Sequence, residues 1–157
     1  MELGTWASEQ ATGAMTIDDD RGRKLVTWSS KLAVGVQTID EQHMKLIDLV
    51  NQLSDAMYSG RGQNMLSRAL KVLEAYALYH FDTEERLMDA HEYSESKTHK
   101  NGHKIFTETV RRFRRRLDSG HVLVSAEVLF FLREWIVSHI MQGDRDLGLV
   151  LNRSGAK

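Results

Sequence analysis

The sequence predicts an all-α protein, an antiparallel up-down-up-down four-helix bundle with an N-terminal arm. In four successive stretches, apolar residues recur at steps of three and four, which places their side chains on one face of a helix. The chain contains no proline, the residue that most readily breaks a helix. Because short segments join the four stretches, consecutive helices are expected to be antiparallel neighbours.

The first helix is expected from Asp40 and ends at the glycines of Ser59-Gly60-Arg61-Gly62. The second is expected to follow as far as the break in the pattern over residues 91–96. The third reads from His99 to Leu117, before Asp118-Ser119-Gly120. The fourth helix is expected to include residues 128–139 and to end at Gly143. After it, residues 147–151 are expected to form one last helical turn.

Length and composition narrow the class of protein. A chain of 157 residues fits one domain. Its 21 Lys and Arg against 22 Asp and Glu give a net charge of −1, which argues against a nucleic-acid-binding protein. The lack of cysteine excludes a disulfide scaffold and thiolate metal sites. No apolar run is long enough to span a membrane and no apolar stretch follows Met1, so we expect no membrane insertion, no signal peptide and a cytoplasmic location.

The chain is expected to have three parts. Residues 1–24 contain glycines and the acidic run Asp18-Asp19-Asp20 and show no periodicity, which predicts a flexible N-terminal tail. The bundle is expected to occupy residues 25–151. Residues 152–157 are expected to form a short C-terminal tail.

Most of the histidines lie on the apolar stripe of a helix, that is, on the face expected to point toward the core. Five of the seven histidines have such a position: His43, His80, His99, His103 and His139. Glu84 lies one turn after His80 on the same stripe, and His99 and His103 are also one turn apart. A single inward histidine is usually a hydrogen-bonded core residue. Five buried imidazoles and a carboxylate without partners would together cost several kcal/mol, a cost that a shared metal site removes.

Asp144 is a separate case because it follows His139 by five residues. In a straight α-helix this spacing turns the two side chains about 140° apart. They can share a site only if the helix loosens or ends between them, and Gly143 stands where such a break is needed. Asp144 also fits an ordinary charged C-terminal segment, and the spacing alone leaves both interpretations open.

Four short motifs resemble the ligand pattern of the hemerythrin family, in the family's order. They are IDEQH at 39–43, HFDTEE at 80–85, HKNGH at 99–103 and HIMQGD at 139–144. The most similar branch is the single-domain bacterial hemerythrins, and the resemblance covers roughly residues 25–151. The sequence departs from many relatives in a loop, where Tyr93-Ser94 replaces Tyr-Pro, and the segment 1–24 has no counterpart in the short members.

The resemblance implies a non-haem di-iron centre with an oxo or hydroxo bridge. It assigns His99, His103 and His139 to one iron, and His43 and His80 to the other. Glu84 and Asp144 would bridge the two. The iron with two histidines would keep an open position for O2, as reactive metal sites generally do. By their positions beside the motifs, the residues that resemble the family's apolar O2 pocket are Leu46, Phe81, Trp135, Ile136 and Ile140.

Three functions remain compatible with this site. The first is reversible O2 binding for storage, delivery or local supply, without catalysis and by a chain that acts as a monomer. The second is an oxygen or redox sensor that acts through a separate protein partner. The third is an enzyme, either a di-iron oxidase or a catalyst that handles nitric oxide. The ligand set favours the first, because ferritin-like di-iron proteins use about four Glu and two His, whereas here imidazoles predominate.

Other polar and aromatic residues are expected to be structural. The arginines from Arg111 to Arg116 are expected on a solvated outer face, with Phe113 pointing inward. His91 and His121 match no motif and are expected at the surface. Tyr76 and Trp28 are expected to pack against the core, Trp28 by resemblance to an aromatic residue that anchors the family's N-terminal arm.

Overall fold

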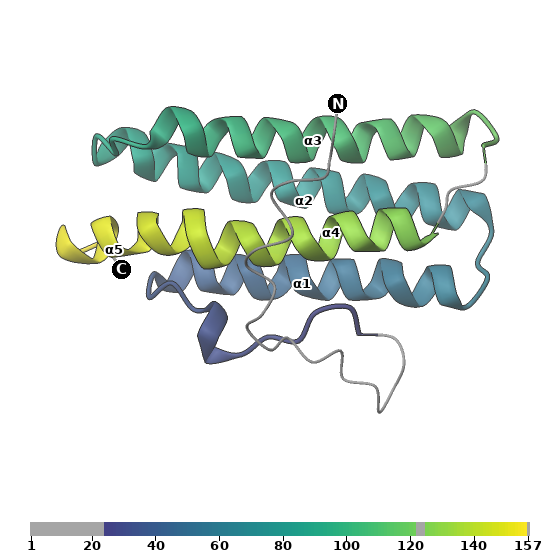
Figure 1. Cartoon of the computed structure of the whole chain (residues 1–157), viewed down its shortest axis with the longest axis horizontal. Helices are drawn as coiled ribbons and strands as arrows, with labels where there is room; N and C mark the ends of the chain where they lie inside the picture. The colour runs from purple at the N-terminus through teal and green to yellow at the C-terminus, as the bar shows by residue number, and fades with distance from the viewer. Residues whose placement is uncertain (1–23, 122–124, 157) are drawn as a thin grey trace.

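Four long helices lie side by side and antiparallel in the computed structural model (Figure 1), which describes residues 24–121 and 125–156. They are α1 (Gln37–Tyr58), α2 (Gln63–Ala90), α3 (Ser96–Asp118) and α4 (Ser125–His139). A π-helical turn, η2 (Ile140–Asp144), continues α4 into α5 (Arg145–Arg153). This architecture confirms the predicted all-α four-helix fold. None of the helices in the described part of the chain is long and apolar enough to cross a membrane.

Gly143 does not end the fourth helix, contrary to the sequence-based expectation. The residues on either side of η2, His139 and Arg145, both have right-handed helical backbone angles, so the chain stays helical from α4 to α5. The last turn expected over 147–151 is part of α5, which continues to Arg153, within the predicted C-terminal tail. The predicted flexible segment 1–24 lies outside the described residues except for Lys24.

The core is a continuous apolar layer between the four helices. Its fully buried side chains include Ile39 and Leu53 of α1, Leu73 of α2, Phe106 of α3 and Leu132 of α4. The sequence encodes these contacts directly, because each helix repeats apolar residues at steps of three and four. Most of the buried polar side chains gather at one level of this layer, which is where the candidate site lies.

An N-terminal arm, which contains the short 3-10 helix η1 (Ser30–Leu32), runs beside α1 (Figure 1). Asn51 of α1 holds the arm's start: its side-chain oxygen accepts hydrogen bonds from the backbone N–H groups of Leu25 and Val26, at 2.7 and 3.0 Å. Asp40 accepts from the N–H groups of Val34 and Gly35, which fixes the entry into α1. Trp28 packs half-buried against the core, as expected.

Gly148 allows α5 to approach the arm closely, and this contact gives a first prediction. A Cβ at this position would lie 2.5 Å from the backbone oxygen of Val34, which also accepts a hydrogen bond from Asn152. Gly148→Ala is therefore expected to lower the free energy of unfolding by about 1–3 kcal/mol, measured by urea denaturation. Gly62→Ala is the control, because nothing lies within 4 Å of its Cβ position. Equal stability of the two variants would contradict the prediction.

Candidate metal centre

All seven predicted ligand residues converge at one level inside the bundle. They come from every long helix and from η2, and they are His43, His80, Glu84, His99, His103, His139 and Asp144. The side chains of Glu84 and Asp144 are completely buried, whereas that of His139 remains 11% exposed. The inward helix faces predicted from the sequence therefore bring the five histidines and Glu84 together, whereas Asp144 reaches the site by a different route.

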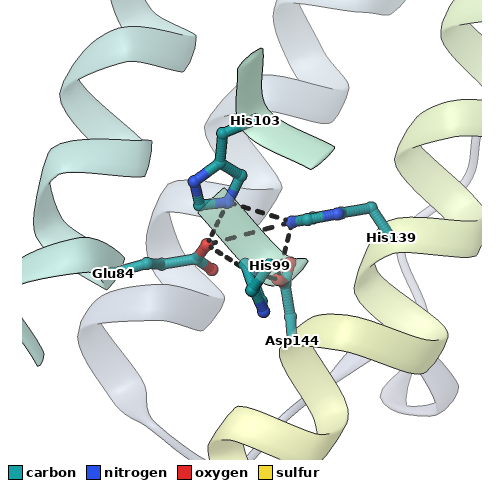
Figure 2. Close-up of side chains that lie close together, drawn as sticks. All are labelled: Glu84, His99, His103, His139 and Asp144. Atoms are coloured by element: carbon teal, nitrogen blue, oxygen red, sulfur yellow. Dashed lines mark hydrogen bonds and ion pairs between the residues drawn. The ribbon is translucent and has the colours of Figure 1, made fainter. Parts of the chain in front are cut away.

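One side of the site contains three imidazoles (Figure 2). The Nε2 atoms of His99 and His103 lie 3.3 and 3.0 Å from Oε2 of Glu84. The Nε2 atoms of His99 and His139 both lie 3.0 Å from Oδ1 of Asp144. The Nε2 atoms of His103 and His139 are only 3.1 Å apart, so the three rings turn the same nitrogen toward a common point.

The other side of the site contains two imidazoles. The Nε2 atom of His80 lies 3.2 Å from Oε1 of Glu84, and that of His43 lies 2.9 Å from Oδ2 of Asp144. Each carboxylate thus turns one oxygen toward the group of three histidines and the other oxygen toward the group of two. This is the arrangement that two carboxylates would need in order to bridge two metal ions.

The π-helical turn explains how Asp144 reaches this site. A π-helix closes hydrogen bonds between residues five apart, so it brings residue i+5 above residue i. His139 and Asp144 have this separation, and η2 lies between them. Of the two interpretations that the sequence left open, the structure supports a loosened helix that shares Asp144 with His139.

Two residues that the sequence analysis did not single out, Gln42 and Glu85, contact the Nδ1 atoms of two of these imidazoles. Nδ1 of His80 lies 2.8 Å from the side-chain oxygen of Gln42, and Nδ1 of His103 lies 2.9 Å from Oε1 of Glu85. These acceptors keep the proton on Nδ1 and leave Nε2 free to bind a metal, as in many metal sites. Both residues lie inside the motifs given above. A histidine that binds a metal through Nε2 usually donates its Nδ1–H group to an acceptor, and this requirement could have identified them from the sequence.

Burial and charge act in opposite directions on the ionisable groups. Burial alone would lower the pKa of His43, but its contacts with Asp144 and Glu84 outweigh burial and raise the pKa to about 9. The same balance raises the pKa of His139 to about 10. Burial would raise the pKa of each carboxyl, yet the surrounding imidazoles hold the pKa values of Glu84 and Asp144 well below their usual range. Both carboxylates are therefore ionised and can bind a cation.

Buried atoms without hydrogen-bond partners test whether a metal fits. Among the described residues, such atoms include Nε2 of His43, Oε1 of Glu84 and both carboxylate oxygens of Asp144. Although His43 Nε2 and Asp144 Oδ2 are 2.9 Å apart, they are not aligned as a hydrogen bond. Within each group the donor atoms lie within 4.8 Å of one another, close to the span of two metal–ligand bonds of about 2.1 Å. The site therefore fits metal ions, with five donors on one side and four on the other.

Four of the five residues of the predicted O2 pocket are buried, and two of the five stack on imidazoles of the site. Leu46, Ile136 and Ile140 are buried in the core. Phe81 stacks on His103, with ring centroids 3.9 Å apart, and Trp135 stacks on His139 at 4.3 Å. Both aromatic rings thus lie against the group of three histidines, and Trp135 also lines a cleft between α3 and α4.

The arginine cluster on α3 is only partly on a solvated face, which corrects the expectation. Arg111 donates a hydrogen bond of 2.6 Å to the buried carboxylate of Glu74 on α2, and Arg114 lies 3.5 Å from the same side chain. The ion pair between Arg111 and Glu74 therefore links α3 to α2. Outside the site, His121 is exposed and His91 is half-buried, where its ring contacts the hydroxyl of Ser154 at 3.0 Å. Tyr76 packs half-buried on the core, as expected.

Gly143 leaves space for the ring of His99, a predicted metal ligand, and this leads to a second prediction. A Cβ on Gly143 would lie 3.3 Å from Cε1 of His99, whereas one on Gly102 would lie at an ordinary 3.6 Å from His139. Gly143→Ala is expected to weaken metal binding about 10-fold by displacing the His99 ring. Gly102→Ala, also in a helix, is the matched control. Competition with a chelator measures both affinities, and identical values would contradict the prediction.

This fold and donor set correspond to a known class of non-haem metal proteins. A family profile described as "Hemerythrin HHE cation binding domain" matches residues 34–148. The chain therefore belongs to the hemerythrin family, whose fold binds non-haem iron and generally serves to bind oxygen.

Named relatives and solved structures agree with this assignment. The chain is 33% identical over 103 residues to a bacteriohemerythrin of Pseudomonas aeruginosa. The matched region covers 66% of this chain and 66% of that protein, or about two thirds of each. It is 28% identical over 112 residues to a bacteriohemerythrin of Methylococcus capsulatus, covering 71% of this chain and 85% of the relative. A crystal structure of wild-type hemerythrin matches with a TM-score of 0.76 and 28% identity, over 81% of this chain and 98% of that one.

Proposed function

We propose that the protein binds O2 reversibly at a di-iron centre, for storage, delivery or local supply. One observation carries this proposal: Glu84 and Asp144 each divide their oxygens between a group of three imidazoles and a group of two. Two bridging carboxylates need two metal ions. The group with two imidazoles, His43 and His80, supplies one donor fewer and would leave a coordination position open for O2.

The chain's own residues define what happens at this centre. The five imidazoles and two carboxylates would hold the two irons, which supply the electrons that O2 accepts when it binds. Gln42 and Glu85 orient two of the rings through their Nδ1 atoms. Buried aliphatic side chains, among them Leu46 and Ile136, exclude water from the surrounding core.

The donor set favours a carrier over a catalyst. Ferritin-like di-iron proteins use about four Glu with two His, whereas this site combines five imidazoles with two carboxylates. Fewer anionic ligands stabilise the ferric state less, so the ferrous state remains accessible and oxidation by bound O2 can reverse. We therefore propose that O2 is bound and released rather than consumed.

An absorption spectrum combined with metal analysis tests this proposal. Protein expressed with ample iron is expected to contain about two irons per chain. The spectrum of the reduced protein should change in air and return when the sample is degassed. About one zinc and no iron per chain, or a change in the spectrum that degassing fails to reverse, would contradict reversible O2 binding. Metal content must be measured directly, since histidine-rich sites also bind zinc.

A further inference from the structure

A cleft of about 460 Å³ opens between α3 and α4, beside the group of three histidines. Ile105, Phe131 and Trp135 form its apolar walls. Tyr93, Glu95 and Asp146 also line it, from the segments that precede α3 and follow η2. The size and the largely apolar lining with a few polar groups are typical of sites for small organic molecules, whose volumes are about 300–1,000 Å³.

Two glycines at this cleft have no side chain to cover the Nδ1 edges of two imidazole rings of the site. A Cβ on Gly143 would lie 3.4 Å from Nδ1 of His99, and one on Gly102 would lie 3.6 Å from Nδ1 of His139. Both glycines and both histidines line the cleft. Each ring directs its Nε2 atom toward the carboxylates, which leaves its Nδ1 atom on the opposite side (Figure 2).

These two Nδ1 atoms differ from those of His80 and His103. Gln42 and Glu85 accept from the latter pair, but within the described part of the chain no acceptor is hydrogen-bonded to Nδ1 of His99 or His139. When Nε2 binds a metal, Nδ1 carries the ring's proton and becomes a donor. The cleft thus offers two N–H donors beside the aromatic ring of Trp135.

We propose that this cleft binds an uncharged, planar aromatic compound with carbonyl oxygens, of the quinone class. Its rings would pack against Trp135 and Phe131, and a carbonyl oxygen would accept from Nδ1 of His99 or His139. The carboxylates of Glu95 and Asp146 disfavour an anion in the same cleft. They can accept hydrogen bonds from the hydroxyl groups of the reduced form, a hydroquinone.

Such a ligand would supply reducing equivalents to the metal centre, and this step rests on the proposed function. The bound hydroquinone would break its two O–H bonds and become a quinone. Its two electrons would reduce two ferric ions held by the adjoining imidazoles to the ferrous state. Its two protons would leave to the solvent through Glu95 and Asp146, both of which are exposed. The oxidised carrier would in this way regain its O2-binding state.

Calorimetric titration of the full-length, iron-loaded ferric protein with menadione, an uncharged two-ring quinone, tests the site. One menadione is expected to bind per chain. Ile105→Trp fills the cleft and should weaken binding at least about 10-fold, whereas Val72→Trp is the control. Both residues are branched, half-exposed and helical, at 49% and 53% exposure, but Val72 does not line the cleft. Thr98→Trp, two turns before Ile105 on α3 and also in the lining, provides a second blocking variant.

An anionic aromatic probe tests the charge argument separately. Naphthoate should bind at least about 10-fold more weakly than menadione, and Glu95→Gln should narrow this difference. Equal binding of the two probes, absence of menadione binding, or unchanged binding in both blocking variants would overturn the inference. Iron content and the reversible spectrum are measured on the same sample. Failure of menadione binding in a protein that reversibly binds O2 overturns this inference alone, whereas absence of iron overturns the proposed function as well.

Discussion

Glu84→Gln is expected to remove most of the iron from the protein, whereas His80→Ala is expected to remove about one of two ions. The reason is the position of Glu84, whose Oε1 atom faces His80 and whose Oε2 atom faces His103. An amide of the same shape is a weak ligand for both metals, so neither group remains complete. His80 contributes only to the group of two imidazoles, and the group of three keeps its donors without it.

Iron analysis of the purified variants measures this difference, and circular dichroism shows whether each variant is folded. His91→Ala and His121→Ala are the controls, because neither residue belongs to the site. Both are expected to keep the iron content and the visible spectrum of the unmodified protein. Full iron content in a folded Glu84→Gln variant would exclude the bridging role, and loss of iron from either control would show that the ligand assignment is wrong.

The helical arrangement was predictable because it depends on local sequence properties. Steps of three and four place Leu53 and Leu73 in the core whatever the neighbouring helices do. Glycines marked the turn after α1 correctly, since Gly60 has a positive φ of 63°. Gly143 has a different role: it leaves room for the His99 ring, a contact between helices that periodicity along one helix cannot indicate.

The inward direction of the five candidate ligand histidines was predictable for the same reason, and the remaining polar contacts were not. His43 and His80 follow the apolar period of their own helices, so their inward direction is encoded locally. Asp144 requires a change from i→i+4 to i→i+5 hydrogen bonding, which has no periodic signature. The ion pair of Arg111 with Glu74 depends on the alignment of α3 with α2. A run of arginines looks solvated when only its own helix is considered.

Ile136→Glu is expected to accelerate oxidation of the oxygenated protein to the ferric form by about 10-fold or more. Ile136 is only 2% exposed and lies three residues before His139 on α4. In the proposed O2 pocket, which follows from the resemblance to the family, Ile136 would face the open coordination position, where an aliphatic wall would withhold water and protons. A carboxyl group there would bring both to the site. Ile136→Ala should have a smaller effect, because it opens a cavity without adding a polar group, and should lower stability by about 2–5 kcal/mol.

The decay of the oxygenated absorption band in air at fixed pH measures this effect, with iron content determined before and after. Leu129→Ala is the matched control for the cavity, since Leu129 is also buried on α4 but lies two turns farther from His139. It should lose stability to a similar extent without faster oxidation, which separates water access at the metal from general loosening of the core. If Ile136→Glu retains its iron and decays no faster than the unmodified protein, then Ile136 does not protect the oxygen site and must be removed from the proposed pocket.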